Sequence, residues 1–247
     1  MRLCGIAACF LLWIIPSNAQ APLSNSAVDT AGNLYVAYST ASSNLLAAKY
    51  DPLGAQVYSN PLGTGSKAYG VSVDVAGNLY IVYADSTSNL FAAKYNSTGG
   101  IVYANSLGTG NEVTGVSVDG AGNLYVLYTD SSSGVFAVKF NATGGLVYSN
   151  SLGTGSHASG ISVNGAGELY VVYTNSSSSL FAVKYNATGG LVYSRSLGAG
   201  ARAASFTIDP AGSLFVVYSD GRDTLARGYP AFVNRNFTIK FTRLLRS

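Results

Sequence analysis

The sequence contains few charged residues and almost no cysteine or histidine. Asp, Glu, Lys and Arg make up 10% of the 247 residues, and the formal net charge is only +3. So small a net charge argues against a nucleic-acid partner. Both cysteines, Cys4 and Cys9, fall in an apolar N-terminal segment. The rest of the chain therefore can form no disulfide and no cysteine-ligated metal site, and we expect neither a metal nor a cofactor.

Long apolar runs are also missing, except for one at the N-terminus. The largely apolar residues 3–16 follow Met1 and Arg2 and precede the small residues Ser17, Asn18 and Ala19. This run is shorter than the ~20 residues that a membrane-spanning helix needs, and its flanks are typical of a secretory signal peptide. We predict that residues 1–19 are removed before Gln20. Residues 20–247 would then be secreted, periplasmic or displayed at the cell surface, with no membrane span.

Residues that could carry out catalysis are scarce. The only histidine, His157, has no repeated acidic residue near it, and no GxSxG motif marks a serine nucleophile. A glycosidase needs a pair of carboxylates at its centre, but Glu112 and Glu168 are the only glutamates in the chain. We therefore expect a protein that is not an enzyme.

What the sequence does contain is an internal repeat of 45 residues. The segment AGNLY begins at residues 31, 76 and 121, and it returns as AGELY at 166 and AGSLF at 211. Each repeat holds four short runs rich in Val, Ile, Tyr and Phe, which favour strands. Repeats of this length with several strands are typical of β-propeller blades. We predict an all-β propeller of five repeats, each of four antiparallel strands, with units 26–70, 71–115, 116–160, 161–205 and 206–247.

The last unit departs from this pattern. A β-solenoid would have fewer strands in each coil, so the four runs per repeat favour blades. After residue 220, however, only FTIKFT at 237–242 resembles a strand, and it matches the third strand of the other units. We therefore predict an incomplete last blade, either in an imperfectly closed five-bladed ring or in an open arc of a larger propeller. An unpaired edge of this kind could lead to homo-oligomers.

The turns between strands consist of residues with known conformational roles. In the DxxGN turn the aspartate can accept hydrogen bonds from nearby backbone amides, and the glycine can adopt a positive φ. In the NxTGG turn a glycine pair connects the third and fourth strands. The residues assigned to the DxxGN turns are Asp29, Asn33, Asp74, Asn78, Asp119, Asn123 and Asp209. The lysines at 49, 94, 139 and 184 lie mid-strand, and we expect them to point outward with their stems over apolar surface.

These repeats resemble a known bacterial family, the SBBP β-propeller repeat. The resemblance covers about residues 26–242 and is carried in the second unit by Asp74, Gly77, Asn78, Tyr80, Phe91, Lys94, Gly99, Tyr103, Leu107 and Gly108. The chain departs from the family where tyrosine replaces a frequent glycine, at Tyr38, Tyr83, Tyr128, Tyr173 and Tyr218. The resemblance implies a propeller on an exported or surface protein, and it implies little about activity.

One position differs between units while its surroundings repeat. After the LGTG-like segment the units have Lys67, Glu112, His157 and Arg202, and two residues further Tyr69, Thr114 and Ser159. We place these residues in variable loops on one face, where a rigid scaffold usually carries its binding residues. The sequence thus predicts an exported, non-catalytic scaffold that binds an unknown protein or glycan. A lectin-like carbohydrate-binding module is the alternative, and a propeller glycosidase or lyase is less favoured.

Overall fold

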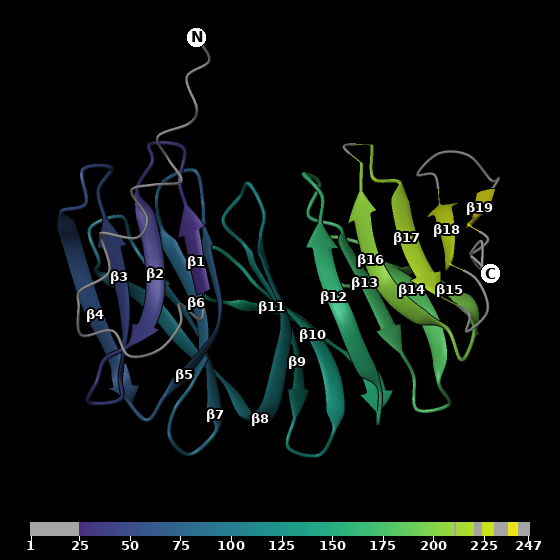
Figure 1. The fold of residues 1–247 in the computed structure, drawn as a ribbon, viewed down its shortest axis with the longest axis horizontal. Coiled ribbons are helices and arrows are strands. Elements are labelled where there is room, and N and C mark those ends of the chain that lie inside the picture. Colours follow the sequence, from purple (N-terminus) through teal and green to yellow (C-terminus); the bar gives the residue numbers. More distant parts are fainter. Residues whose placement is uncertain (1–24, 210, 220–223, 230–236, 242–247) are drawn as a thin grey trace, which may run out of the picture. The chain divides into compact units, whose positions relative to one another are not determined.

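The computed structural model of the chain describes residues 25–209, 211–219, 224–229 and 237–241. Every regular element among these residues is a β-strand (Figure 1). The predicted signal peptide lies outside the described residues. Within the part of the chain that the structure describes, no helix has the length and apolarity that a bilayer crossing requires.

The strands form antiparallel sheets in which neighbours along the chain pair side by side. The first sheet consists of β1 (Asn25–Val28), β2 (Leu34–Ser39), β3 (Asn44–Tyr50) and β4 (Gln56–Thr64). The next consists of β5 (Lys67–Val73), β6 (Leu79–Ala84), β7 (Asn89–Tyr95), β8 (Ile101–Val118), β9 (Leu124–Asp130), β10 (Gly134–Phe140) and β11 (Leu146–Thr154). The last two consist of β12 (His157–Val163), β13 (Leu169–Thr174), β14 (Ser179–Tyr185) and β15 (Leu191–Ala199), and of β16 (Arg202–Ile208), β17 (Leu214–Ser219), β18 (Thr224–Tyr229) and β19 (Phe237–Phe241). The prediction of an all-β fold built from four-stranded antiparallel sheets is confirmed.

The chain divides into two compact units, residues 1–108 (the first unit) and 109–247 (the second unit). From here on, the five 45-residue units are called repeats. The division falls within β8, which is both the outer strand of the second repeat and the inner strand of the third. We predicted two separate strands here. In the other repeats a glycine with φ near 70° ends the outer strand, at Gly65, Gly155 and Gly200. The chain runs through Gly110 as one strand, so two blades share the seven-stranded sheet.

Two further predictions about strands are wrong. The inner strands begin four residues earlier than predicted, at Lys67 in β5 and His157 in β12, because the preceding glycine already completes the turn. The last blade is also not three-stranded. Residues 224–229 form its third strand, β18, and residues 237–241 form a fourth, β19, paired with β18. The place beside β18 that we expected to be unpaired is therefore occupied, and homo-oligomerisation stays a prediction.

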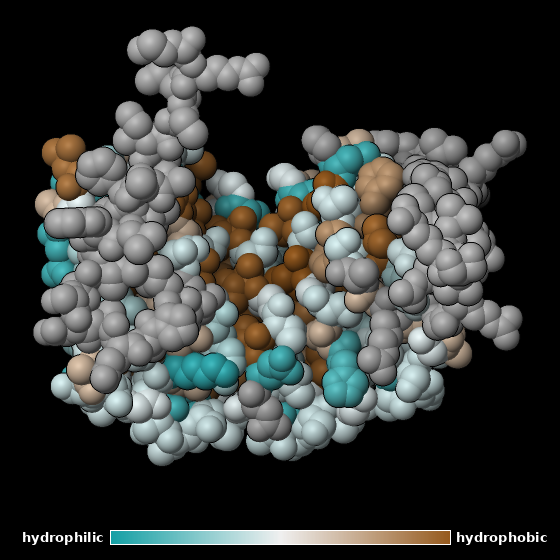
Figure 2. Space-filling model, in the orientation of Figure 1, coloured by the Kyte–Doolittle hydropathy of each residue, from teal (hydrophilic) through white to brown (hydrophobic). Residues whose placement is uncertain are grey.

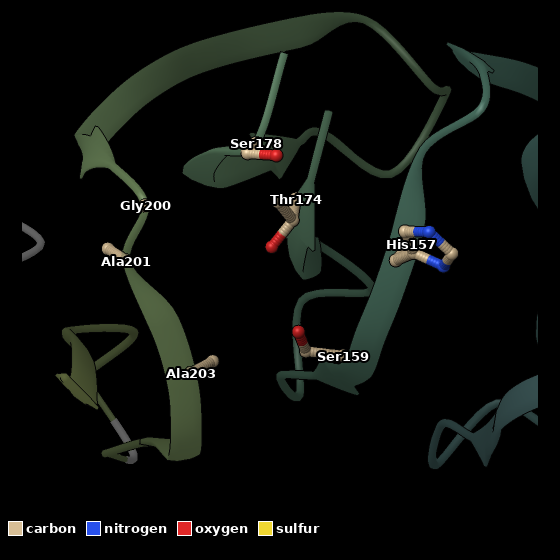
Figure 3. A pocket seen from close by; sticks show the side chains of 7 residues that line it. All are labelled: His157, Ser159, Thr174, Ser178, Gly200, Ala201 and Ala203. Atoms are coloured by element: carbon tan, nitrogen blue, oxygen red, sulfur yellow. The ribbon is translucent and has the colours of Figure 1, made fainter. Parts of the chain in front are cut away.

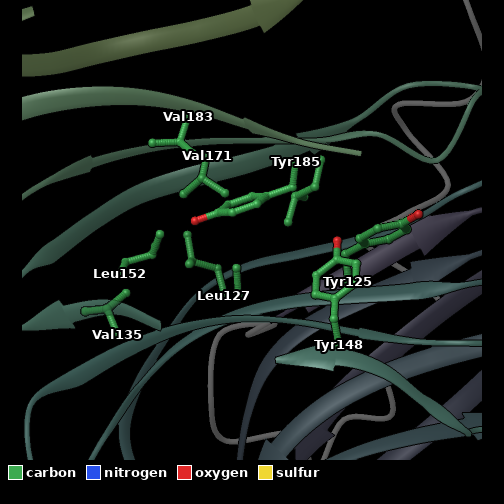
Figure 4. Close-up of a cluster of buried hydrophobic side chains, with 10 residues drawn as sticks. Tyr125, Leu127, Val135, Tyr148, Leu152, Val171, Val183 and Tyr185 are labelled. Carbon is green, nitrogen blue, oxygen red and sulfur yellow. The ribbon is translucent and has the colours of Figure 1, made fainter. Parts of the chain in front are cut away.

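The core lies between neighbouring sheets, where apolar side chains from facing strands meet. In the second unit, residues of β9, β10 and β11 pack against residues of β13 and β14 (Figure 4). Tyr125, Leu127 and Val171 in this cluster are fully buried. Figure 2 shows apolar side chains gathered over the middle of the strands and hydrophilic ones toward the strand ends. The tyrosines that depart from the family pattern have a packing role. For example, the rings of Tyr173 and Phe181 stack across neighbouring strands with centroids 5.6 Å apart.

Candidate functional site

Within each compact unit, hydrogen bonds link the DxxGN turn of one blade to that of the next. In the first unit the Asp29 carboxylate accepts hydrogen bonds from the Ala31 and Asn33 amides and from the Tyr35 hydroxyl. The same Tyr35 hydroxyl lies 3.0 Å from the carbonyl oxygen of Gly77, in the turn of the next blade. This arrangement returns with Asp119, Tyr125 and Gly167 in the second unit, so it is part of the structural framework of the repeat.

The electrostatics of these turns follow from their hydrogen bonds. Burial by itself raises the pKa of the Asp119 carboxyl, but hydrogen bonds from Asn123, from Tyr125 and from backbone amides outweigh it. The pKa of Asp119 is therefore lowered. Burial and the bond to Asp119 raise the pKa of Tyr125. The aspartate is thus held as an anion and the tyrosine as a hydrogen-bond donor, which suits a structural contact rather than proton transfer.

We predicted that the repeated lysines point outward, and this is wrong for Lys49, Lys94 and Lys139, which are buried. Lys139 is only 5% exposed, its Nζ lies 5.0 Å from the centroid of the Tyr125 ring, and it donates to the Ala187 carbonyl at 2.9 Å. Lys49 is buried in the same way over Tyr35. A buried ammonium needs partners, and here the tyrosine ring and the next blade's NxTGG turn supply them. The invariance of this lysine between repeats was the sequence signal for a buried role.

The positions that vary between repeats lie on the inner strands and not in loops. Lys67 and His157 are the first residues of β5 and β12, and Glu112 lies in β8. Arg202 is the first residue of β16, but its side chain lies outside the described part of the structure. The Lys67, Glu112 and His157 side chains are exposed. The prediction that these positions lie in loops is therefore wrong, and a strand holds them more firmly than a loop would.

A β-bulge follows each of these positions. The pairing register shifts between Ala68 and Gly70, between Val113 and Gly115, and between Ala158 and Gly160. The extra residues at these bulges are Tyr69, Thr114 and Ser159, which are the second set of predicted site residues. Bulges of this kind re-aim side chains and are frequent beside binding sites. No feature of the sequence indicated them.

The site residues do not form one cluster of shared chemistry. In the first unit the Lys67 ammonium lies over the ring of Tyr69, 4.5 Å from its centroid. In the second unit Thr114 makes a long contact, 3.5 Å, with the Leu127 carbonyl. Among the described residues, no group of three or more His, Cys, Asp or Glu side chains is placed to hold a metal ion.

His157 and Ser159 line a hollow of about 580 Å³ in the second unit. The other walls are Thr174 at the end of β13, Ser178 in the following turn, and Gly200, Ala201 and Ala203 at the start of the last blade. Figure 3 shows the Ser159 and Thr174 hydroxyls and the Ala203 methyl directed into the space between β12 and β16. Thr174 lies directly across the sheet from His157. Sequence reasoning found the first two residues but missed the other five, because their proximity depends on how blades stack.

Comparisons with known proteins bear on the fold. No protein-family model and no curated protein matches the chain, so membership of the SBBP repeat family stays a prediction. A protein of unknown function from Bacteroides caccae is 17% identical, with 82% of this chain and 72% of that one covered and a TM-score of 0.53. A protein from Lactobacillus plantarum is 15% identical, with 89% and 71% covered and a TM-score of 0.60. A structure titled eukaryotic initiation factor is 8% identical, with 89% and 55% covered and a TM-score of 0.65. At these identities the likeness shows an all-β fold of the β-propeller type.

Proposed function

We propose that this protein is an exported, non-catalytic β-propeller scaffold that binds a partner through the exposed residues at the starts of its inner strands. One observation carries the proposal. The 45-residue repeats share their turns, core tyrosines and mid-strand lysines. They differ at one equivalent position, which is Lys67, Glu112, His157 or Arg202. The three of these side chains that are described are exposed. Residues that only maintain the fold recur from repeat to repeat, whereas a binding surface needs different side chains at each position.

The bulges support the same assignment. A bulge interrupts the ladder of the inner strand two residues after each variable position. It adds one extra residue beside each variable position, Tyr69, Thr114 or Ser159, and such bulges re-aim side chains. A rigid sheet behind these side chains lowers the entropy lost on binding. Because the four positions carry a lysine, a glutamate, a histidine and an arginine, the partner surface would be polar and of mixed charge.

The test compares two sets of substitutions at opposite ends of the same strands. The first replaces Lys67, Glu112, His157 and Arg202 with alanine. The control replaces exposed residues of the DxxGN turns, Val75→Ala, Gly120→Ala and Gly165→Ala. An added Cβ meets no atom within 4 Å at Gly120 or Gly165. The sample is the secreted chain, whose first residue should prove by mass spectrometry to be Gln20.

Wild type and both variants are applied in parallel to a protein array and a glycan array, and each is also melted. We expect the wild type and the control to bind the same array spots, and the first variant to lose them by about tenfold or more in affinity, or about 1.4 kcal/mol. All three should melt together, since exposed substitutions usually change stability by only about 0.5 kcal/mol. Equal binding by the wild type and the fourfold alanine variant would show that no partner binds at the starts of the inner strands.

A further inference from the structure

The hollow between β12 and β16 is made at one place where the repeat changes. The segment LGTGSHASG leads into β12, but LGAGARAAS leads into β16. Alanine thus stands at 199, 201 and 204, where the equivalent positions 45 residues earlier are Thr154, Ser156 and Ser159. The buried Ser156 hydroxyl bonds to the Leu152 carbonyl at 3.2 Å. At 201 the last blade has a methyl group instead, which is 1% exposed and packs in the core, and beside it the partly buried Ala203 gives the hollow an apolar wall.

The opposite wall is polar, and among the described side chains that line it none is a carboxylate, ammonium or guanidinium group. It consists of the hydroxyls of Ser159, Thr174 and Ser178 and the imidazole of His157. Hydroxyl groups both donate and accept hydrogen bonds, and so does a neutral imidazole with its two nitrogens. A ligand with many hydroxyls offers the same mixture. A purely apolar ligand would leave these groups without partners, at a cost of about 1–3 kcal/mol each.

The backbone of the hollow is fixed in advance. Ser178 has φ of 58°, in the left-handed region, and its carbonyl accepts a 2.7 Å hydrogen bond from the Gly200 amide. This bond holds the turn after β13 to the start of the last blade, so two walls of the hollow keep a set separation. A pre-formed site avoids the entropy cost of ordering its walls when a ligand binds.

We propose that this hollow binds an uncharged sugar residue, with the ring hydroxyls on Ser159 and Thr174 and the apolar face of the ring on Ala203. Its volume of about 580 Å³ lies within the roughly 300–1,000 Å³ of small-ligand sites. The hollow opens to solvent beside His157, which is exposed, so the sugar can be the end of a longer glycan. This inference deepens the proposed function by naming the ligand class at one of its positions.

Ser159→Tyr is the variant that tests the site. It places in the hollow the residue that β5 already has at the equivalent bulge, Tyr69. A tyrosine at this bulge is therefore compatible with the conformation of an inner strand. The matched control is Ser194→Tyr, the same change at an exposed position of β15 that is not among the residues lining the hollow. Ala203→Val provides a second obstruction, because valine stands at the equivalent Val113.

The only histidine of the chain provides the measurement. Since His157 lines the hollow, an untagged sample gives a single imidazole resonance that reports on it. Maltose, cellobiose, lactose and diacetylchitobiose are titrated in turn, with galacturonate as a charged comparison. We expect at least one uncharged disaccharide to shift the resonance saturably in wild type and in Ser194→Tyr. Ser159→Tyr and Ala203→Val should weaken this binding by about tenfold or more.

Three outcomes would overturn the inference: no uncharged sugar shifts the resonance, only galacturonate does, or Ser159→Tyr binds as wild type does. The array experiment separates these results from the proposed function. A protein partner lost in the fourfold alanine variant, with no sugar bound, would keep the scaffold and remove the sugar site. Sugar binding blocked by Ser159→Tyr, with array binding unchanged in the fourfold variant, would keep the sugar site and remove the wider surface.

Discussion

At the scale of the residue, the turn of the fourth repeat carries its side-chain amide and its carboxylate at exchanged positions. Where the third repeat has Asp119 and Asn123, the fourth has Asn164 and Glu168. The Asn164 amide donates to the Glu168 carboxylate at 2.8 Å, and the Lys184 ammonium lies 2.7 Å from the same carboxylate. Burial raises the pKa of Glu168, but the bonds from Lys184 and Asn164 outweigh it, so that the pKa is lowered. The turns of the third and fourth repeats thus each keep one carboxylate and one side-chain amide.

This exchange leads to a prediction for the third repeat. Asp119→Asn removes the carboxylate that accepts from Asn123 and Tyr125, and that lies, like the Lys139 ammonium, beside Gly167. We expect a loss of about 1–3 kcal/mol in unfolding free energy. The double variant Asp119→Asn/Asn123→Glu reproduces the fourth repeat and should regain most of that loss. Urea denaturation of the three proteins measures it. A double variant no more stable than the single one would show that the two positions are not coupled.

At the scale of the element, the NxTGG turn of one blade packs against the outer strand of the blade before it. An added Cβ on Gly189 would lie 2.6 Å from Cγ of Tyr148, and Gly189 has φ of 89°. The Gly189 carbonyl accepts a hydrogen bond from the Asn150 side chain at 2.8 Å. The contact of Gly99 with Tyr58 in the first unit is alike. The glycine is therefore needed both for the local turn and for the approach of two blades.

Two glycine substitutions separate this role from the general effect of adding a methyl group. Gly189→Ala should cost about 1–2 kcal/mol for the left-handed backbone, and about 1–3 kcal/mol more for crowding Tyr148. Gly165→Ala, in an exposed turn with no neighbouring atom within 4 Å, should change stability by no more than about 0.5 kcal/mol. Denaturant midpoints compare the two variants with wild type. Equal midpoints for the two would contradict the packing role of this turn.

At the scale of the whole molecule, the repeated turn aspartates couple stability to pH. The pKa values of Asp29, Asp74, Asp119 and Asp209 are all lowered from the ordinary value of 3.8. Burial is the largest influence on the first three and raises their pKa, but hydrogen bonds to the carboxylates outweigh it. For Asp209 the hydrogen bond from the Ser213 amide is the largest influence and lowers the pKa.

A folded pKa below the unfolded one means that the folded state binds fewer protons. The stabilisation is therefore complete above the unfolded pKa and is lost as the pH falls through the folded pKa. We expect the urea midpoint to be level between about pH 7 and pH 5 and to fall below about pH 4. Return to pH 7 should restore it. A midpoint that stays level down to about pH 2 would show that the turn carboxylates do not stabilise the fold.

The period, the strand-forming runs and the turn chemistry could be predicted from the sequence, since these depend on residues close together along the chain. The Asp29 carboxylate bonds to amides only two and four residues away, so a short motif was enough to predict it. The resemblance of the repeats to one another then indicated blades. The variable positions were also visible, because four equivalent places could be compared within one chain.

Only the tertiary structure decided how blades contact one another. The Tyr35 hydroxyl reaches a carbonyl 42 residues away, and Lys139 reaches one 48 residues away. Whether a mid-strand lysine faces water or the next blade depends on stacking, which the sequence of one strand does not contain. The fourth strand of the last blade and the hollow beside Ser159 likewise could not be predicted from the sequence of a single strand. Both arise where segments that the repeat pattern does not align are brought together by pairing and packing between strands.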